Sequence, residues 1–551
     1  MPPGKNLRYW PPELPLHLEL PQTSLYYNLE VAAQRYPNRA AVIYYGTEIS
    51  YARLKRETDA LAGFLQRRLG LAKGDRAVLF MQNCPQFVIA FYAILKCGAV
   101  VVPVNPMNRA AELAAIVADS ASRVALFADE RSAEIASLLG GQLEHSVSVH
   151  YADYLEAASD LPIPEVIRAP RTAPAASFDW RDALRCGLEA AAVPVVAEDL
   201  AVIPYTSGTT GDPKGCMHTH ASAMHTAVAS MEFCHAAKDQ VVLAALPFFH
   251  VTGLQLSLNA VIFGGASIVV MTRWDRQCAA RLIERYAVTA WTAIPSMLID
   301  FLAQPGLEHF ELGSLRLLTG GGVAMPRAVA EKIQALWKLP YVEGYGLSET
   351  IATALTNPVQ RPKSQCLGIP IQDTQAVIVN PYTLEIIAQG EVGEILLSGP
   401  QIFAGYWRNP DATAAAFVGL HGRRFFRTGD LGYEDEDGYF FIVDRLKRMI
   451  NASGYKVWPA EVESQFYAHP EILEACVIAA SDAQRGETVK LVAVLRPGAS
   501  ACAEELSAWA RERMAAYKVP RVYQFVESLP KSATGKVQWR VLQDGESLLA
   551  R

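Results

Sequence analysis

Hydrophobic and polar positions follow two different periods along the first half of the chain. Apolar residues recur at helical spacing over Ala52–Leu69, and helical patterns begin again at Pro85 and at Asn108. Between them lie short, mostly apolar runs at Arg76–Phe80 and Ala99–Val104, which are typical of strands buried on both faces of a sheet. This alternation of helices and buried strands predicts a layered α/β architecture.

The second half of the chain begins with the same alternation and then changes. Strands are predicted near Val241–Leu246, Ala266–Met271 and Leu315–Leu318, with helical segments between them. Beyond Leu367 the pattern consists of short strands and turns, for example the strand Gly393–Leu397. This change predicts a smaller, β-rich region after the layered part.

A length of 551 residues, together with this change in pattern, predicts several folding units in two domains. Residues 1–444 are predicted to form a large N-terminal domain of layered α/β subdomains plus a small β-rich subdomain. A compact tail with its own pattern begins near Arg445, and residues 445–551 are predicted to form a small α+β C-terminal domain.

Composition narrows the class of protein. Lys and Arg total 50 against 56 Asp and Glu, so the formal charge of −6 provides no broad basic surface, and we predict no nucleic-acid partner. The nine cysteines are scattered without a Cys-x-x-Cys pair, which argues against a disulfide framework and a zinc ribbon. The N-terminus does not resemble a signal peptide, and Lys96 breaks the most apolar stretch, Phe87–Leu95, so no transmembrane segment is predicted. These features predict a cytoplasmic small-molecule enzyme.

The segment Tyr205–Gly215 concentrates glycines, hydroxyls and one lysine. Glycines let successive backbone N–H groups turn toward one anion, hydroxyls add donors, and a lysine adds a point charge. An apolar segment leads into it and a helix-compatible segment follows, which favours a polyphosphate-binding loop over a solvated linker. The candidate phosphate ligands are Thr206, Ser207, Gly208, Thr209, Thr210 and Lys214.

Two common nucleotide-binding motifs are absent. A Walker A loop needs a second glycine after four intervening residues, and Pro213 stands at that position after Gly208. The run Gly320–Gly322 continues into Val323 and does not complete Gly-x-Gly-x-x-Gly. The chain is therefore predicted to be neither a P-loop NTPase nor a dinucleotide-dependent oxidoreductase.

Five segments follow one another in order: Tyr205–Gly215, Glu343–Thr350, Arg427–Asp430, Asp444–Lys447 with Ser453–Lys456, and Pro530–Lys536. They resemble the phosphate loop, the adenine and magnesium motif, the ribose motif, the hinge and crossover motif, and the C-terminal lysine motif of the adenylate-forming superfamily. That superfamily includes acyl-CoA synthetases, luciferases and the adenylation domains of peptide synthetases. The resemblance spans nearly the whole chain and implies ATP, Mg²⁺ and coenzyme A as cofactors and a carboxylic acid as substrate.

The residue types in these motifs suit a nucleotide. Glu349 is a hard oxygen ligand for Mg²⁺. Tyr345 offers a flat face to a purine, and Gly344 permits close approach. Asp430 can accept two hydrogen bonds from the ribose hydroxyls. The resemblance assigns further nucleotide contacts to Glu343, Ser348, Arg445 and Lys536, and catalytic roles to Thr206, Glu349 and Lys536.

The resemblance places Lys536 at the reacting centre, where an ammonium would stabilise the charge that builds on the α-phosphoryl and carboxyl oxygens. The same lysine cannot remain there while a thiol attacks, so the C-terminal domain is expected to be mobile about a hinge at Lys447. This motion would bring Ser453 and Gly454 to coenzyme A. The context of Lys536 also resembles acetylation sites of bacterial acyl-CoA synthetases, which implies a lysine acetyltransferase as a partner. A homodimer is also compatible with the sequence.

The segment Pro247–Leu254 resembles the start of the family's acyl pocket. It has no Asp to pair with an α-amine, which disfavours an amino acid substrate. Gly346 stands where acetyl-specific relatives carry a Trp, and its missing side chain predicts a deep pocket. A mostly apolar lining favours a medium- or long-chain fatty acid over an aryl acid of the benzoate or cinnamate type. The predicted acyl contacts are His250, Val251, Leu254, Gly320, Gly321 and Gly346.

Other activities and one other site stay open at this point. A luciferase-like oxygenase would form the same adenylate and then use O₂, and a stand-alone loading enzyme would pass the acyl group to a separate carrier protein. A metal site could be imagined at His218, His220 and His225. On a helix the first and last of these would share a face and the middle one would not, which disfavours a metal there.

Overall fold

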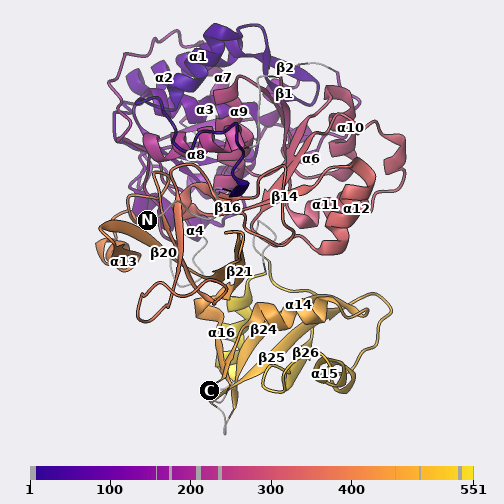
Figure 1. The fold of residues 1–551 in the computed structure, drawn as a ribbon. Helices are drawn as coiled ribbons and strands as arrows, with labels where there is room; N and C mark the ends of the chain where they lie inside the picture. Colours follow the sequence, from indigo (N-terminus) through magenta and orange to yellow (C-terminus); the bar gives the residue numbers. More distant parts are fainter. Residues whose placement is uncertain are drawn as a thin grey trace. The chain divides into compact units, whose positions relative to one another are not determined.

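The computed structural model describes residues 8–156, 158–172, 177–206, 213–233, 239–452, 455–482, 486–531 and 537–549 (Figure 1). The chain divides into two compact units. Unit 1 contains Met1–Gln375 and Leu397–Phe426, and unit 2 contains Ala376–Leu396 and Arg427–Arg551. The division therefore passes through strands β18 (Gly393–Ser398) and β20 (Arg423–Glu434). The predicted domain boundary at Arg445 lies within unit 2 and stays a prediction.

Unit 1 contains a seven-stranded sheet in the order β7-β6-β5-β3-β4-β8-β9. Its neighbouring strands are parallel except β8 and β9, which are antiparallel. Parallel neighbours need crossover connections, which explains why helices alternate with strands in this part of the chain. The strands are β3 (Arg76–Phe80), β4 (Val100–Pro103), β5 (Val124–Ala128), β6 (His145–Val149), β7 (Phe178–Asp179), β8 (Leu200–Val202) and β9 (His218–Thr219).

Unit 1 also contains a nine-stranded sheet in the order β16-β15-β14-β13-β12-β10-β11-β1-β2. Its central strands are parallel, and antiparallel pairs close both edges. The strands are β1 (Ala40–Tyr44), β2 (Thr47–Ser50), β10 (Val241–Ala244), β11 (Ser267–Val270), β12 (Ala290–Thr292), β13 (Leu317–Gly321), β14 (Tyr341–Leu347), β15 (Ala352–Thr356) and β16 (Ile369–Pro370).

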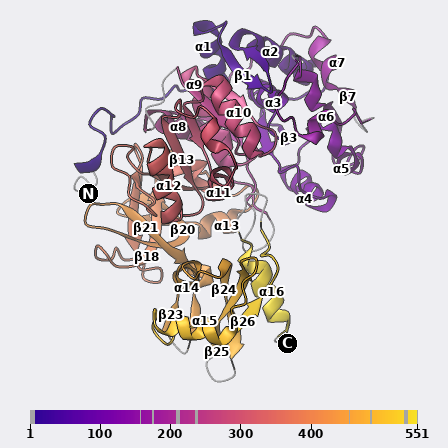
Figure 2. The ribbon, with the colours of Figure 1, turned by 90° about the vertical axis from the view of Figure 1, so that its right-hand side faces the viewer.

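The helices α1 (Tyr26–Arg35), α2 (Tyr51–Arg67) and α3 (Pro85–Lys96) lie side by side in unit 1 (Figures 1 and 2). Every residue of α3 from Pro85 to Leu95 is buried, because its apolar side chains cover the whole circumference of the helix. The predicted buried helix is therefore confirmed. In the described ranges, no helix combines the length and apolar character needed to cross a membrane.

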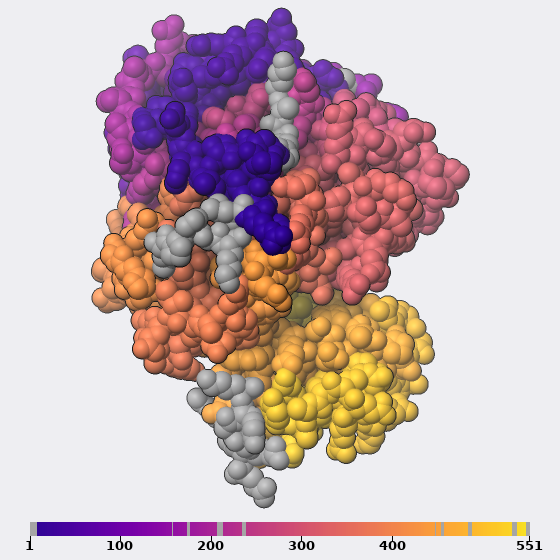
Figure 3. Space-filling model, in the orientation of Figure 1, coloured from indigo at the N-terminus to yellow at the C-terminus, as the bar shows by residue number. Residues whose placement is uncertain are grey.

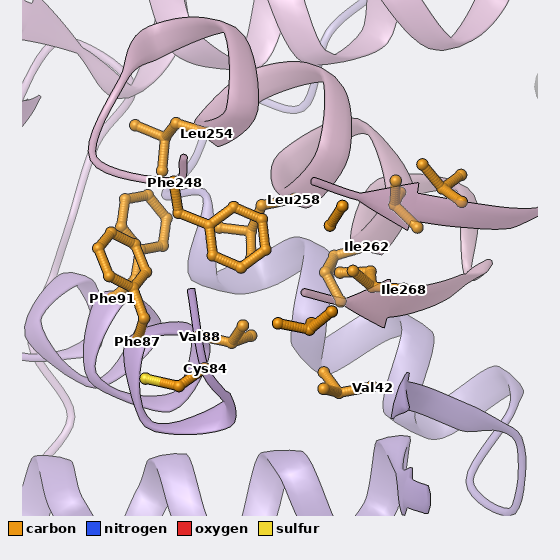
Figure 4. Packing of buried hydrophobic residues seen from close by; sticks show 14 of the residues in the cluster. Val42, Cys84, Phe87, Val88, Phe91, Phe248, Leu254, Leu258, Ile262 and Ile268 are labelled. Carbon is orange, nitrogen blue, oxygen red and sulfur yellow. The ribbon is translucent and has the colours of Figure 1, made fainter. Parts of the chain in front are cut away.

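The main apolar core of unit 1 forms between α3, the π-helix η4 (Gly253–Asn259), α9 (Ala260–Gly264) and the neighbouring strands. Figure 4 shows Phe87, Phe91, Phe248 and Leu254 gathered on one side of this core. The rings of Phe87 and Phe248 lie 5.6 Å apart between centroids. These contacts join the two sheets through the helices between them.

Unit 1 also contains further helices and the strand β19, which pairs with β20 in a separate sheet. They are α4 (Ala110–Ser120), η2 (Asp129–Arg131), α5 (Ser132–Ala136), η3 (Tyr151–Tyr154), α6 (Glu165–Arg168), α7 (Trp180–Arg185), α8 (His220–Phe233), α10 (Arg276–Tyr286), α11 (Pro295–Leu302), η5 (Leu307–His309), α12 (Arg327–Trp337), η6 (Ser348–Thr350), α13 (Pro410–Ala415) and β19 (Phe417–Leu420). The N-terminal segment crosses the surface of this unit (Figure 3), where the backbone N–H of Leu18 and the ring of His17 both contact Asp373.

Unit 2 has its own sheet and core. Strands β23-β22-β25-β24 are neighbours in this order, and β26 pairs with β25. Buried side chains such as Val462, Phe466, Val477, Leu491 and Leu506 form its core. Its elements are β17 (Gln375–Val379), β21 (Phe440–Arg445), η7 (Leu446–Arg448), β22 (Ile450–Ala452), β23 (Tyr455–Val457), α14 (Pro459–Tyr467), β24 (Ile472–Asp482), β25 (Gly486–Leu495), α15 (Ala503–Arg511), β26 (Val522–Phe525) and α16 (Trp539–Leu549).

The predicted strand Leu315–Leu318 is the one that shifts most. The observed strand β13 runs over Leu317–Gly321, because Gly320 and Gly321 pair with two residues of β14. A Cβ atom on Gly320 would stand 2.1 Å from the carbonyl oxygen of Ala293. Glycine is needed here for close backbone approach, which a sequence pattern does not distinguish from a loop.

Candidate functional site

The two ends of the predicted phosphate loop are held together at its base. The backbone N–H of Thr206 donates to the carbonyl of Lys214 at 2.9 Å, and the backbone N–H of Lys214 lies 3.3 Å from Thr206 Oγ1. One residue further out, Tyr205 and Gly215 form a β-bridge. β8 precedes this hairpin, and the two-residue strand β9 separates it from α8. A strand and a helix therefore flank the loop as predicted, with one additional short strand before the helix. Ser207, Gly208, Thr209 and Thr210 lie outside the described residues.

A backbone segment at Phe403–Trp407, here called the strap, connects this loop to the predicted magnesium ligand. The N–H of Trp407 donates to the carbonyl of Gly215 at 2.8 Å, and Cys216 and Tyr406 form a β-bridge. At the other end of the strap, the N–H of Phe403 donates to the carbonyl of Glu349 at 2.9 Å. The strap therefore connects Gly215 and Cys216, at the C-terminal end of the loop, to η6, which contains Glu349.

The side chain of Tyr406, in the strap, contacts both Glu349 and Lys214. The hydroxyl of Tyr406 donates to Glu349 Oε1 at 2.8 Å, and Lys214 Nζ lies 5.1 Å from the centroid of the Tyr406 ring. Burial and the carboxylate of Glu349 raise the pKa of Tyr406, so its hydroxyl remains a donor at neutral pH. Lys214 and Glu349 thus contact the same side chain, a tyrosine that the sequence reasoning missed, and their binding of phosphate and Mg²⁺ stays a prediction.

The donor set fits a magnesium ion that retains water. In the described part of the chain, no three His, Cys, Asp or Glu side chains are grouped as a protein metal cage would need. Mg²⁺ is usually bound by one or two carboxylates, with waters and substrate phosphates as its other ligands. Glu349 supplies one such carboxylate, and the hydroxyl of Thr206 is a second oxygen near the loop.

Glu343, a predicted nucleotide contact, uses its carboxylate inside the protein. It is buried on β14, and its oxygens accept from the backbone N–H groups of Met325 at 2.9 Å and Gln365 at 2.5 Å. Burial raises the pKa of this carboxyl, and the N–H donors oppose that effect. Glu343 therefore hydrogen-bonds the backbone at Met325 and at Gln365, next to Gly344 and the buried ring of Tyr345. Contacts of these three residues with adenine stay predictions.

The packing of the neighbouring strand requires glycine at position 346, which the sequence reasoning did not consider. A Cβ atom built on it would stand 1.4 Å from the carbonyl oxygen of Ala352 in β15. The register of β14 and β15 shifts between Tyr345 and Gly346, which brings the two backbones together. The neighbouring strand therefore requires glycine at position 346 whether or not a pocket lies there, and the deep pocket stays a prediction.

The predicted acyl contacts after Pro247 lie at the start of a π-helix. Val251 and Leu254 are buried in the main core, and Figure 4 shows Leu254 beside Phe248. His250 is half-buried. A π-helical segment is rare and often marks a functional region. Whether these side chains, Gly320 or Gly321 contact an acid stays a prediction.

The three clustered histidines have structural contacts. His218 was expected on the following helix, but it lies in β9, and its Nε2 donates to the carbonyl of Ser348 at 2.7 Å. In α8, His225 Nε2 donates to the carbonyl of Gln372 at 3.0 Å. Burial lowers the pKa of His218, His220 and His225 to about 4 each, so all three are neutral at pH 7. His218 thereby holds η6, one residue before Glu349.

Unit 2 brings together the two predicted ribose ligands. Asp430 and Arg445 are direct partners in the register of β20 and β21, and Arg445 Nε lies 2.8 Å from Asp430 Oδ1. The side chain of Asp430 is buried and that of Arg445 is 39% exposed, so the guanidinium remains accessible to a ligand. The prediction that these residues share a site is consistent with this pairing, and their binding to ribose stays a prediction.

Sequence reasoning missed Glu394, which supports the same turn. Its buried carboxylate lies 2.6 Å from Arg427 Nη2 and accepts from the backbone N–H of Gly429 at 3.1 Å. Gly429 adopts a φ of 69°, which glycine tolerates. The available signal was a single Glu in the otherwise apolar strand β18, since a buried charge needs a partner.

The remaining predicted residues belong to the hinge and to the C-terminal motifs. Lys447 lies in the short turn η7, and the next residue, Arg448, forms an ion pair with Glu463 of α14. Ser453, Gly454 and Lys536 lie outside the described residues. Their roles stay predictions.

Comparison with known protein families covers both units. The model of the AMP-binding enzyme family matches residues 29–407, and the model of the AMP-binding enzyme C-terminal domain matches residues 461–536. The matched ranges include the loop base, the strap and Glu349.

Individual relatives extend over the whole chain. A long-chain-fatty-acid–CoA ligase of Bacillus subtilis (strain 168) is 36% identical over 566 residues, covering 98% of each chain. The structure of ATP-bound MatB from Rhodopseudomonas palustris has a TM-score of 0.84 at 26% identity and covers 96% of this chain and 100% of that one. The anthranilate CoA ligase AuaEII, solved with anthranoyl-AMP, has a TM-score of 0.84 at 26% identity, covering 98% and 99%. The chain belongs to the AMP-binding enzyme family.

Proposed function

We propose that this protein is an AMP-forming acid:CoA ligase. In the first step, a carboxylate oxygen of the acid attacks the α-phosphorus of ATP, and pyrophosphate leaves. In the second step, the thiol sulfur of coenzyme A loses its proton and attacks the acyl carbon, and AMP leaves. Family membership supports the reaction class, and the neighbours solved with ATP and with anthranoyl-AMP support these ligands. The observation that carries the proposal is the meeting of Lys214, Tyr406 and Glu349 beside the loop base.

The loop region is suited to hold the pyrophosphate that leaves. Thr206 and Lys214 stand at its two ends and supply a hydroxyl and a cation to the β- and γ-phosphates. Mg²⁺, when bound at Glu349, neutralises charge on the phosphate oxygens. Because the bond that breaks lies between the α- and β-phosphates, the loop need not present the γ-phosphate for transfer, which accounts for its departure from Walker spacing.

Unit 2 and the C-terminal motifs supply the other proposed roles. Asp430 and Arg445 bind the ribose, Lys536 acts at the α-phosphate, and Ser453 with Gly454 contacts coenzyme A. Lys447 is the hinge between the two steps. The ion pair of Asp430 and Arg445 supports the first of these assignments, because it presents a carboxylate and a cation at one place.

The proposed substrate is a medium- or long-chain fatty acid. The support is the Bacillus subtilis relative, whose name specifies long-chain fatty acids and which matches nearly the full length of both proteins. An aryl acid is the second candidate, and the neighbour solved with anthranoyl-AMP favours it.

The test is the release of AMP with ATP, Mg²⁺ and coenzyme A across a panel of acids. The panel contains linear acids from short to long chains together with benzoate and cinnamate. AMP release that needs both coenzyme A and a longer linear acid supports the proposal. Activity confined to the aryl acids contradicts the substrate assignment, and AMP release that does not depend on coenzyme A contradicts the ligase assignment.

Three further assignments complete the proposal. A cytoplasmic location is part of the proposal, and it is supported by the eight cysteines among the described residues, which are free thiols as in a reducing compartment. Acetylation of Lys536 by a lysine acetyltransferase would remove the charge that the first step uses. Association into a homodimer is tested by the mass of the protein in solution.

A further inference from the structure

Tyr406 contacts two groups on which the proposed reaction depends. Its hydroxyl donates to Glu349 Oε1 at 2.8 Å, while Lys214 Nζ lies 5.1 Å from the centroid of its ring. One side chain therefore touches the carboxylate with its polar end and the cation with its aromatic face. The three side chains Lys214, Tyr406 and Glu349 are called the loop triad below.

The backbone and a neighbouring ring hold Tyr406 in place. Its own backbone is bridged to Cys216, and the strap is anchored to the carbonyl of Glu349 by the N–H of Phe403 at 2.9 Å. The rings of Phe403 and Tyr406 pack edge to face with centroids 4.8 Å apart. The backbone contacts fix the position from which the Tyr406 side chain extends, and turning its ring away from the carboxylate would break the contact with the ring of Phe403.

A carboxylate that binds a metal through one oxygen needs a partner that sets its orientation. Such partners typically change metal affinity by 10- to 100-fold when they are removed. The hydroxyl of Tyr406 donates a hydrogen bond to Oε1 of Glu349, and this bond restricts the rotation of the carboxylate group. We infer that Tyr406 is a positioning residue for the magnesium of the proposed reaction, acting through Glu349. This inference rests on the proposed function, because Mg²⁺ reaches the site with ATP.

The chain contains a matched control in its helical layer. The hydroxyl of Tyr26 donates to Asp59 Oδ1 at 2.5 Å, and Lys96 Nζ lies 4.9 Å from the centroid of the Tyr26 ring. This helical triad of Tyr26, Asp59 and Lys96 belongs to α1, α2 and α3. It repeats the contacts of the loop triad with no phosphate loop beside it, so Tyr26→Phe removes the same kind of hydroxyl without touching the site.

The experiment measures Mn²⁺ binding by electron paramagnetic resonance in the presence of α,β-methylene-ATP, which cannot be cleaved at the relevant bond. Tyr406→Phe keeps the ring over Lys214 and removes only the hydroxyl. Mn²⁺ affinity is expected to fall about 10-fold in Tyr406→Phe and to stay unchanged in Tyr26→Phe. Affinity for the analogue without metal, measured by calorimetry in EDTA, is expected to stay unchanged in both variants.

A double-mutant cycle with Glu349→Gln separates positioning from general damage to the fold. If the hydroxyl acts through the carboxylate, Tyr406→Phe has no further effect on Mn²⁺ affinity in the Glu349→Gln background. An equal loss of Mn²⁺ affinity in both backgrounds, or wild-type Mn²⁺ affinity in Tyr406→Phe, overturns the inference while the ligase assignment stands. A wild-type protein that binds neither the analogue nor Mn²⁺ with it overturns the proposed function and this inference together.

Discussion

The helical triad and the loop triad each contain a tyrosine whose hydroxyl donates to a carboxylate and whose ring lies near a lysine, and they differ in whether that lysine also pairs with the carboxylate. In the helical triad Lys96 Nζ lies 2.5 Å from Asp59 Oδ1, so the lysine and the carboxylate neutralise each other. In the loop triad, within the residues that the structure describes, Lys214 forms no ion pair and its charge lies over the tyrosine ring. One triad is closed by its own salt bridge, and the other keeps its cation apart from its carboxylate.

This difference shows why the residue types alone do not identify a site. Separated charges of opposite sign can each take a ligand of the opposite charge, as proposed for a phosphate at Lys214 and a metal at Glu349. A closed ion pair mainly contributes to stability, and that contribution is modest when the pair is partly exposed. The comparison therefore predicts that equivalent substitutions in the two triads change different properties.

The largest difference is expected for the carboxylates. Glu349→Gln removes the charge proposed to bind Mg²⁺ and should lower the rate of AMP formation about 10²-fold or more, which is the scale for losing one strong electrostatic contact to a transition state. Asp59→Asn should leave that rate unchanged and lower the free energy of unfolding by about 1–3 kcal/mol, because it removes charge-assisted hydrogen bonds in the helical layer. Initial rates and thermal unfolding of both variants measure the two effects. Comparable loss of activity in both would contradict the functional distinction between the triads.

The lysines are expected to differ by a smaller factor. Lys214→Met removes one charge-assisted contact to the phosphates and should raise the KM for ATP about 10- to 100-fold, since such a contact contributes about 1.5–3 kcal/mol. Lys96→Met should leave the KM unchanged and reduce stability by about 1 kcal/mol, the scale of a partly exposed ion pair. Steady-state kinetics over a range of ATP concentrations, with unfolding curves for both variants, provide the measurement. An unchanged KM in Lys214→Met would remove the lysine from the phosphate site.

The sequence predicted the layered part of the fold best where a residue type such as Pro marks the start of an element. The strand Arg76–Phe80 was predicted at its observed bounds, and the buried helix begins at Pro85 as expected, because Pro is favoured in the first turn. The residue types of Tyr205–Gly215 predicted a loop between an apolar strand and a helix, but not the residues that surround its base.

Contacts between distant segments could not be predicted in the same way. Tyr406 and Glu349 are 57 positions apart, and Tyr26 and Asp59 are 33 apart on two different helices, so only the fold brings each pair together. Gly346 illustrates a second limit: an absent side chain is equally compatible with an open pocket and with a neighbouring carbonyl, and the register of β14 and β15 determines which applies.

The smallest predicted effect is the dependence of stability on acid in the helical triad. Burial alone would raise the pKa of Asp59, but hydrogen bonds from Lys55, Lys96 and Tyr26 lower it below its ordinary value of 3.8. A carboxyl whose pKa is lower in the folded state stabilises that state above its unfolded pKa, and the contribution is lost as pH falls through the folded pKa.

The difference in stability between wild type and Asp59→Asn should therefore be constant from pH 7 to about 5 and should shrink as pH falls below 3.8. Thermal unfolding of both proteins across this range measures it, and subtracting the two curves cancels the titration of every other carboxyl. A difference that persists unchanged to pH 3 would mean that Asp59 contributes through packing and neutral hydrogen bonds. The salt bridge between Lys96 and Asp59 would then not be what stabilises the helical triad. Its presence there, and its absence from the loop triad, would not account for a difference in stability between the two.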